Sequence, residues 1–245
     1  MAGGSTAPAG LAACVAALYT RSMTSDATPS SAFDAVLWDF GGVFTTSPFD
    51  NFTRFEQQRG LPKDFIRTIN ATNADDNAWA KMERSEVTPE QFGDLFEVES
   101  RAAGHSLHGR EILPLLAGEL QPVMVTALSI VGRHYKTACL TNNMRAGHGP
   151  SMSRDERRAD EVGGVMDLFD HVVQSSEAGI RKPELRFYQI ACETLDVIPE
   201  RCVFLDDLGV NLKPARAMGM TTIKVLSAAQ AIADLESTLG IPLRD

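Results

Sequence analysis

Five short apolar runs, separated by segments with helical periodicity, constrain the fold of this 245-residue chain more than any other feature. Each run is continuous and does not alternate with polar residues, which is typical of strands that helices cover on both faces. Strands that alternate with helices predict a doubly wound parallel α/β sheet. The runs are FDAVLWD (33–39), TACL (137–140), HVVQS (171–175), CVFLD (202–206) and TTIKV (221–225).

Helix signals stand between these runs. The segment ELRFYQIACETL repeats apolar residues at helical spacing. In LKPARAMGM, Pro214 suits the first turn of a helix and Gly219 suits its end. Thr88 and Gln91 have the spacing of a capping box, and Pro89 suits the first helical position. We therefore expect a helix to begin just after Thr88.

The chain between the first two apolar runs departs from the strand–helix alternation. FDNFTRFEQQRG and FIRTINAT are helix-like and contain no strand signal. We interpret residues 49–120 as a helical cap inserted after the first strand, and residues 33–48 and 121–245 as the α/β core. Residues 1–32 are rich in small residues and proline, which predicts a disordered leader. A secretory signal is the alternative, although no Lys or Arg precedes its apolar stretch.

Composition limits the partners. The formal net charge of −9 argues against nucleic acid or an anionic membrane as the main partner. No apolar run reaches the roughly 18 residues of a membrane span. The four cysteines show no paired spacing, and Cys139 and Cys202 lie inside apolar runs as expected for core thiols. This cysteine usage favours a reducing cytoplasm as the location.

Polar side chains follow four of the predicted strands. Alone, an aspartate after a strand is more often a turn or helix cap than a catalytic group. Together they form an ordered set of acid, hydroxyl, lysine and paired acid, and the carboxyl ends of parallel strands meet at one edge of the sheet. The sequence therefore predicts a site at that edge, built from Asp39, Thr141, Asn142, Lys182, Asp206 and Asp207.

Phosphoryl transfer is the chemistry that needs such a set. A divalent cation held by Asp39 and Asp206 would cancel the repulsion between carboxylates and a phosphate dianion, and Mg²⁺ suits few protein ligands because it keeps waters. Lys182 would add a point charge for the phosphoryl oxygens. Ionised Asp39 would then attack phosphorus. The two glycines at 41 and 42 would let the backbone turn so that the carbonyl of Gly41 and nearby amides face the ligand.

Four motifs resemble those of the haloacid dehalogenase superfamily. They are DFGGVFT, LTNN, GIRKPELRFY and FLDDLGVN, and the match spans about residues 33 to 225. The resemblance implies a Rossmann-like core, with residues 49–120 in the place of a small helical cap of the first type. Within the superfamily, the motifs look most like the amino-terminal phosphatase domain of soluble epoxide hydrolases and the related sugar-1-phosphate phosphatases.

The resemblance also implies a role for each motif residue. Asp39 would be the nucleophile and a metal ligand. Asp206 would complete a Mg²⁺ site, with the Gly41 carbonyl and Asp207 as further ligands; Asp207 would act through water or orient Lys182. Thr141 and Lys182 would bind phosphoryl oxygens. Gly42 and Asn142 would also contact the substrate, and Asn211 would be a supporting polar group.

Gly41 departs from the family pattern. Most phosphatases of the superfamily carry there an aspartate that protonates the leaving oxygen, and loss of such a general acid costs about 10²–10⁴-fold in rate. Three interpretations stay open. In the first, the substrate's leaving group needs little protonation. In the second, water, Thr45 or Glu83 replaces the acid. In the third, catalysis is weak or lost, and the protein binds phosphate or another protein. Dehalogenases, which use no metal, also lack this acid but lack the paired aspartates too.

We therefore predict a Mg²⁺-dependent phosphatase that acts through Asp39 on a small phosphorylated metabolite. A metal-independent 2-haloacid dehalogenase is the less favoured alternative. Trp79 and Met82 are predicted to lie in the core of the cap, although with Glu83 they belong to a segment that can face the substrate. The five histidines show no metal-ligand spacing. Whether the protein is a homodimer stays open.

Overall fold

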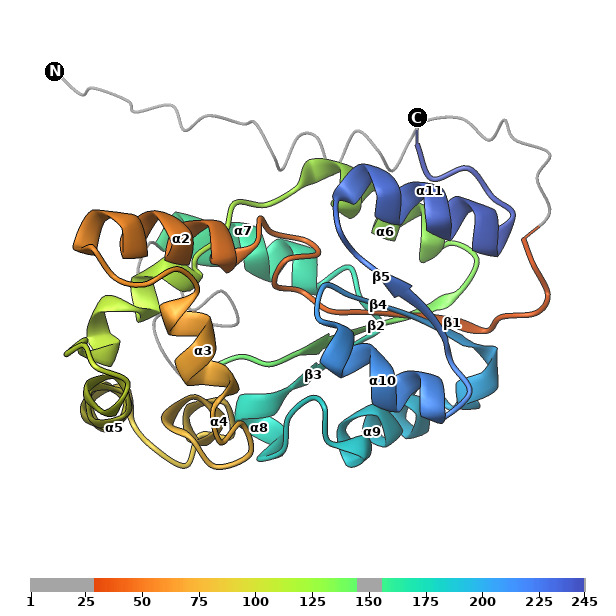
Figure 1. The fold of residues 1–245 in the computed structure, drawn as a ribbon. Coiled ribbons are helices and arrows are strands. Elements are labelled where there is room, and N and C mark those ends of the chain that lie inside the picture. Colours follow the sequence, from red (N-terminus) through yellow and green to blue (C-terminus); the bar gives the residue numbers. More distant parts are fainter. Residues whose placement is uncertain (1–28, 145–155, 245) are drawn as a thin grey trace, which may run out of the picture.

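A computed structural model describes residues 29–144 and 156–244 of the chain (Figure 1). The predicted leader falls largely on residues 1–28, outside the described residues. The elements alternate along the sequence, except that five α-helices and two short 3-10 helices lie between the first two strands. In order they are β1 (Ala35–Trp38), α2 (Pro48–Arg59), α3 (Phe65–Ala71), α4 (Ala78–Glu83), α5 (Pro89–Ala102), η1 (Gly109–Glu111), η2 (Leu113–Leu116), α6 (Pro122–Val131), β2 (Lys136–Thr141), α7 (Glu156–Met166), β3 (His171–Gln174), α8 (Ser175–Ala178), α9 (Leu185–Leu195), η4 (Pro199–Arg201), β4 (Cys202–Asp206), α10 (Gly209–Ala217), β5 (Thr221–Lys224) and α11 (Ala228–Leu239).

The sheet has five parallel strands in the order β3-β2-β1-β4-β5. All five apolar runs form strands, which confirms the predicted parallel α/β fold. Strand β1 lies in the centre, and its Trp38 is level with Cys139 on β2 and with Leu205 on β4. The chain crosses from one side of β1 to the other after β3, which creates the topological switch point where such sheets bind ligands.

Helices cover both faces of the sheet, as Figure 1 shows. Helices α6, α7 and α11 pack on the face that carries Val36 and Trp38 of β1. Helices α9 and α10 pack on the opposite face, against Ala35 and Leu37. All four residues of β1 are fully buried, because a strand covered on both faces has no solvent-facing side. This explains why AVLW shows no alternation.

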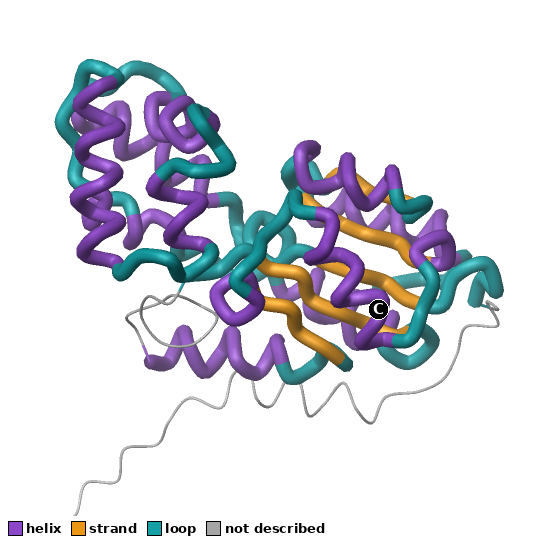
Figure 2. The backbone as a smooth tube through the Cα atoms, turned by 90° about the horizontal axis from the view of Figure 1, so that it is seen from below, coloured by secondary structure: helices purple, strands orange, loops and turns teal. Residues whose placement is uncertain are grey.

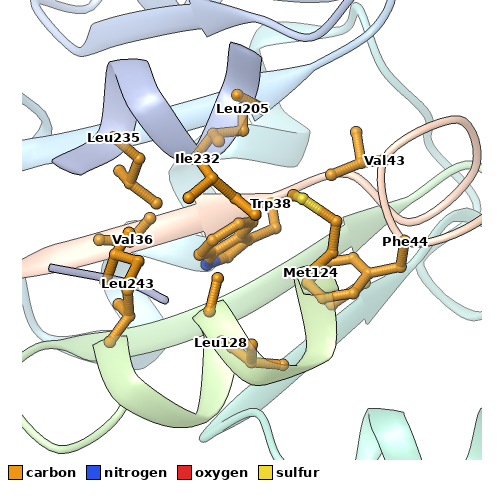
Figure 3. Packing of buried hydrophobic residues seen from close by; sticks show 14 of the residues in the cluster. Val36, Trp38, Val43, Phe44, Met124, Leu128, Leu205, Ile232, Leu235 and Leu243 are labelled. Carbon is orange, nitrogen blue, oxygen red and sulfur yellow. The ribbon is translucent and has the colours of Figure 1, made fainter. Parts of the chain in front are cut away.

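Trp38 lies at the middle of the larger apolar cluster (Figure 3). Its ring contacts Phe44 with a centroid distance of 5.4 Å, and side chains from α6 and α11, including Leu128 and Ile232, surround it. These contacts anchor the residue that directly precedes Asp39. The end of β1 is therefore fully buried and packed from both sides, which places the first predicted site residue at the edge of the core.

Helices α2, α3, α4 and α5, with the short η1 and η2, form a lobe beside the sheet (Figure 2). They bury an apolar cluster of their own, with Phe92 and Phe96 of α5 and Ile66 of α3 fully buried. Helix α5 begins at Pro89 with the predicted capping box between Thr88 and Gln91. We call residues 48–116 the helical segment. The domain limits proposed from the sequence stay a prediction.

Helix α10 differs from its prediction. Pro214 was expected in the first turn, but the helix begins at Gly209 and Pro214 lies in its interior. The missing Pro214 N–H leaves the carbonyl of Val210 without its helical partner, and Val210 is exposed at the amino end of the helix. Gly219 has a positive φ of 95° just past the helix, as predicted for its end.

Two smaller observations bear on the remaining predictions. Cys139 and Cys202 are buried free thiols, as predicted. Within residues 29–144 and 156–244, none of the helices combines the length and apolarity needed to cross a bilayer.

Candidate active site

Three neighbouring strands end in the predicted site residues. Asp39 directly follows β1, Thr141 is the last residue of β2, and Asp206 is the last residue of β4. The backbone N–H of Asp39 donates to Leu205 O at 2.8 Å, so the ladder between β1 and β4 continues to the acid. The parallel register brings the three polar residues to the same edge of the sheet, as the sequence predicts.

Lys182 lies between two of the aspartates. Its Nζ is 2.7 Å from Asp39 Oδ1 and 2.8 Å from Asp206 Oδ2, and the residue is only 1% exposed. Burial opposes the charge of this lysine, but Asp206 and Asp39 outweigh burial and raise the pKa of Lys182. Lys182 is therefore a fixed cation inside the site.

Asp39 has one carboxylate oxygen engaged and one available. Its Oδ1 accepts from the backbone N–H of Phe40 at 2.6 Å and from Lys182. Its Oδ2 has no hydrogen-bond or ion-pair partner in the part of the chain that the structure describes. Burial, together with the charge of Asp206, raises the pKa of Asp39 well above its usual value, although Lys182 opposes the rise. A further cation would favour the ionised form.

Asp206 is held by the first turn of α10. It is completely buried, and its Oδ1 accepts from the backbone N–H of Leu208 at 2.7 Å. Asn211 Nδ2 donates to both oxygens, at 3.1 and 3.0 Å. The hydroxyl of Tyr188 donates to the carbonyl of Asn211 at 2.7 Å. The supporting role expected of Asn211 thus has a geometric basis, whereas sequence reasoning missed Tyr188.

The three aspartates converge on one small volume. One carboxylate oxygen from each of Asp39, Asp206 and Asp207 lies within 4.8 Å of the other two. Burial and the charge of Asp206 raise the pKa of Asp207 to about 6. Three carboxylate oxygens close together are ligands of the kind that a hard divalent cation prefers. Within the described residues, Lys182 pairs with Asp39 and Asp206 and not with Asp207.

The two glycines after Asp39 have different environments. Gly42 has a φ of 73°, and a Cβ added there would lie 2.3 Å from Asp207 Oδ2. Only glycine therefore lets this loop pass beside the acid. Gly41 is exposed, its φ is not in the left-handed region, and a Cβ added there meets no heavy atom within 4 Å. The place of the family's second acid is open, and the Gly41 carbonyl as a metal ligand stays a prediction.

Asn142 fixes the backbone of Lys182. Its Oδ1 accepts from Lys182 N at 2.8 Å, and its Nδ2 donates to Lys182 O at 3.0 Å. The side-chain amide thus bonds both the backbone N–H and the backbone C=O of Lys182, which is 40 positions away in sequence. Because these bonds use the amide, Asn142 supports the site, and its predicted contact with substrate stays a prediction, like that of Gly42.

Glu83 reaches the site from α4 of the helical segment. It is buried, and its Oε2 is 2.5 Å from Arg181 Nε and 3.3 Å from Asn142 Nδ2. Met82 is in the core of the helical segment, and Trp79 packs edge-on against Phe92 at 5.7 Å, as predicted for both. Thr45, the other candidate for the missing acid, accepts from Gly42 N at 3.3 Å.

Comparison with known proteins agrees with this geometry. The sequence matches the family described as haloacid dehalogenase-like hydrolase over residues 33–219. Acyl-CoA dehydrogenase family member 10 of Mus musculus is 34% identical over 218 residues, which cover 86% of this chain and 20% of that protein. Bifunctional epoxide hydrolase 2 of Sus scrofa is 27% identical over 86% of this chain and 40% of its own length. The chain therefore spans less than half of these two relatives.

A relative of similar length carries a phosphatase name. Sesquiterpene phosphatase astK of Aspergillus oryzae is 27% identical over 86% of this chain and 98% of its own length. Among solved structures, a haloacid dehalogenase family enzyme from Bacteroides thetaiotaomicron, crystallised with magnesium and inorganic phosphate, has a TM-score of 0.53 and 19% identity. That alignment covers 78% of this chain and 93% of the other, and it shows the shared fold. With the four motifs gathered at one sheet edge and the family match spanning core and helical segment, this chain belongs to the haloacid dehalogenase-like hydrolase family.

Proposed function

We propose that the protein is a Mg²⁺-dependent phosphatase that hydrolyses a small phosphorylated metabolite through a phosphoryl group carried on Asp39. The observation that carries this proposal is the convergence of three carboxylates and one buried lysine at the carboxyl ends of neighbouring strands. The phosphatase relative of similar length supports a phosphate ester over other hydrolase substrates.

The aspartates form the metal site in this proposal. Asp39, Asp206 and Asp207 would hold Mg²⁺, whose charge offsets the carboxylates when a phosphate dianion binds. Asn211 and the Leu208 N–H keep the Asp206 carboxylate oriented, and such outer contacts set metal affinity in many proteins. A solved structure that shares the fold at 19% identity was crystallised with magnesium and inorganic phosphate, which supports this assignment.

The chain's own residues carry the chemical steps. Asp39 Oδ2, which has no partner among the described residues, attacks phosphorus while the bond to the leaving oxygen breaks. Lys182 and the Thr141 hydroxyl stabilise the phosphoryl oxygens. Water then hydrolyses the acyl phosphate, which releases inorganic phosphate and restores Asp39. We further propose that the helical segment excludes bulk water from the site.

The proton for the leaving oxygen comes from water in this proposal. A Cβ added at Gly41 would meet no heavy atom within 4 Å apart from its chain neighbours, and the Glu83 carboxylate is engaged by Arg181, Asn142 and Trp79. Substrates whose leaving group is weakly basic, such as acyl, anomeric or aryl phosphates, should therefore react fastest.

The direct test is hydrolysis of an aryl phosphate by purified protein. Activity should require Mg²⁺, disappear with EDTA, and disappear in Asp39→Asn, while Asp167→Asn, which changes an exposed acid away from the site, should match wild type. Mass spectrometry of acid-quenched protein should find one phosphoryl group on Asp39. Hydrolysis that persists in Asp39→Asn would contradict the proposed nucleophile.

A dehalogenase or a non-catalytic phosphate-binding protein is the second candidate, and the glycine at position 41 is what favours it. Halide release from a 2-haloacid in the presence of EDTA would identify the dehalogenase. Phosphate binding without turnover over a broad panel of esters would identify the binding protein.

A further inference from the structure

Glu83 occupies a position that is unfavourable for a carboxylate. It is the last residue of α4, where the partial negative charge of the helix end opposes an anion. It is also only 6% exposed, and burial raises its pKa. A buried acid at a helix carboxyl end destabilises the fold unless its partners compensate for it. Its partners therefore indicate why the chain keeps it.

Those partners belong to the two loops that carry the predicted phosphate-binding residues. Glu83 Oε2 forms an ion pair with Arg181, which directly precedes Lys182, and accepts from Asn142, which directly follows Thr141. Oε1 accepts from Trp79 Nε1 at 3.1 Å. One carboxylate thus joins both loops to the helical segment, through an ion pair with Arg181 and hydrogen bonds from Asn142 and Trp79.

Further hydrogen bonds join the same elements at this junction. Arg181 also donates through Nη1 to the carbonyl of Ala74 at 2.9 Å, and its side chain is 14% exposed. Ser85, two residues after Glu83, donates to the carbonyl of Ser176 at 3.1 Å. Asn142 completes the connection, because the same amide that contacts Glu83 holds the backbone of Lys182.

We propose that Glu83 is a positioning residue that couples the helical segment to Lys182, acting through Arg181 and Asn142. This proposal rests on the proposed phosphatase function. Glu83 orders the Arg181–Lys182 loop so that Lys182 Nζ sits between Asp39 and Asp206, at 2.7 and 2.8 Å from their carboxylate oxygens. Loss of the carboxylate leaves the Arg181 guanidinium without its anion, and the loop rearranges.

Two other roles for Glu83 make different predictions. If it only added negative charge near the phosphate, its neutralisation would improve substrate binding and raise kcat/KM. If it only stabilised the fold, Glu83→Gln would lower Tm and leave kcat and KM unchanged well below Tm. Positioning predicts a fall in kcat, because a displacement of about 1 Å in a reacting group can cost 10²-fold in rate.

The experiment compares Glu83→Gln, Arg181→Met and the double variant with wild type on an aryl phosphate in saturating Mg²⁺. Each single variant should lower kcat at least tenfold and change KM less than threefold. The double variant should lose no more than the larger single loss, because both changes break the same ion pair. The matched control is Glu86→Gln, which removes an exposed acid paired with Arg84 in the same segment and should match wild type.

Three results would each overturn the positioning role while the phosphatase function stands. Glu83→Gln could have the same kcat and KM as Glu86→Gln, or a higher kcat/KM than wild type. Alternatively, the losses of the two single variants could multiply in the double variant. If wild type hydrolyses no phosphate ester, the proposed function fails, and crystal structures decide the positioning role. Glu83→Gln should then separate Lys182 Nζ from Asp39 or Asp206, and unchanged distances would overturn the proposal.

Discussion

At position 41 the backbone accepts a side chain that the protein does not have. A Cβ there meets no heavy atom within 4 Å, and the φ angle is outside the left-handed region. Gly41→Asp should therefore fold normally and supply a general acid two residues after Asp39. We expect it to raise kcat about 10²-fold for an alkyl phosphate and much less for an aryl phosphate, whose leaving group needs little protonation. A plot of log kcat against leaving-group pKa, which should be steep in wild type, would become flatter.

The neighbouring glycine provides the contrast. Gly42 has a positive φ, and a Cβ would lie 2.3 Å from Asp207 Oδ2. Gly42→Ala should therefore lose activity on every ester, because the substitution displaces Asp207. A shallow leaving-group dependence in wild type would show that another group already donates the proton, and an equally steep dependence in Gly41→Asp would show that the new carboxyl does not donate it.

Asp207 gives the metal-free protein a pH dependence. Burial, with the charge of Asp206, raises its pKa from the usual 3.8 to about 6 in the folded chain. Protonated Asp207 fits this buried position, so its contribution to the free energy of unfolding is fully present below about pH 3.8. The contribution is lost as the pH rises through about 6, because the folded protein must then bury a charged carboxylate. In EDTA, Asp207→Asn should be more stable than wild type at pH 7.5 by about 1–3 kcal/mol, with a smaller difference at pH 5. Urea unfolding at the two pH values measures this, and a difference that grows toward low pH would contradict it.

The first turn of α10 is the element that orients Asp206. Asn211 Nδ2 bonds both carboxylate oxygens, and Leu208 N–H holds one of them. Asn211→Ala should weaken Mg²⁺ binding by about 10–100-fold, as typical for residues that orient a metal ligand. The Mg²⁺ dependence of phosphatase activity measures this, and excess Mg²⁺ should restore most of kcat. Gln58→Ala, on the exposed side of α2 in the helical segment, serves as the control. An unchanged Mg²⁺ requirement in Asn211→Ala would show that α10 does not orient the ligand.

At the scale of elements, the sequence predicted the strands because each buried strand is a continuous apolar run, and it predicted the start of α5 because a capping box is a local signal. Asp39, Thr141 and Asp206 were predictable because each stands at a strand end in the same sheet. The interior position of Pro214 was not predictable, since the exposure of Val210, whose carbonyl loses its helical partner, depends on where α10 lies. Glu83 was suspected of replacing the acid, but its bond to Asn142 joins residues 59 positions apart, which no local pattern shows.

At the scale of the whole molecule, one bound cation should control stability. The chain carries a net charge of −9, and three of its carboxylates converge beside Lys182, which pairs with two of them. A cation that binds the folded state alone adds about 2.7 kcal/mol at a concentration of 100 times Kd. For a domain of this size, that corresponds to a rise in Tm of about 5–10 °C.

Differential scanning fluorimetry in Mg²⁺ and in EDTA measures this rise without any substrate. Wild type should gain Tm with Mg²⁺ and lose the gain when EDTA is added, while K⁺ at equal ionic strength should give no comparable rise, because screening alone does not bridge the carboxylates. Asp206→Asn should show no Mg²⁺-dependent shift even if its Tm in EDTA is higher than that of wild type. A shift of equal size in wild type and Asp206→Asn would mean that the cation binds elsewhere, and the aspartates at the strand ends would then need another explanation for lying so close together.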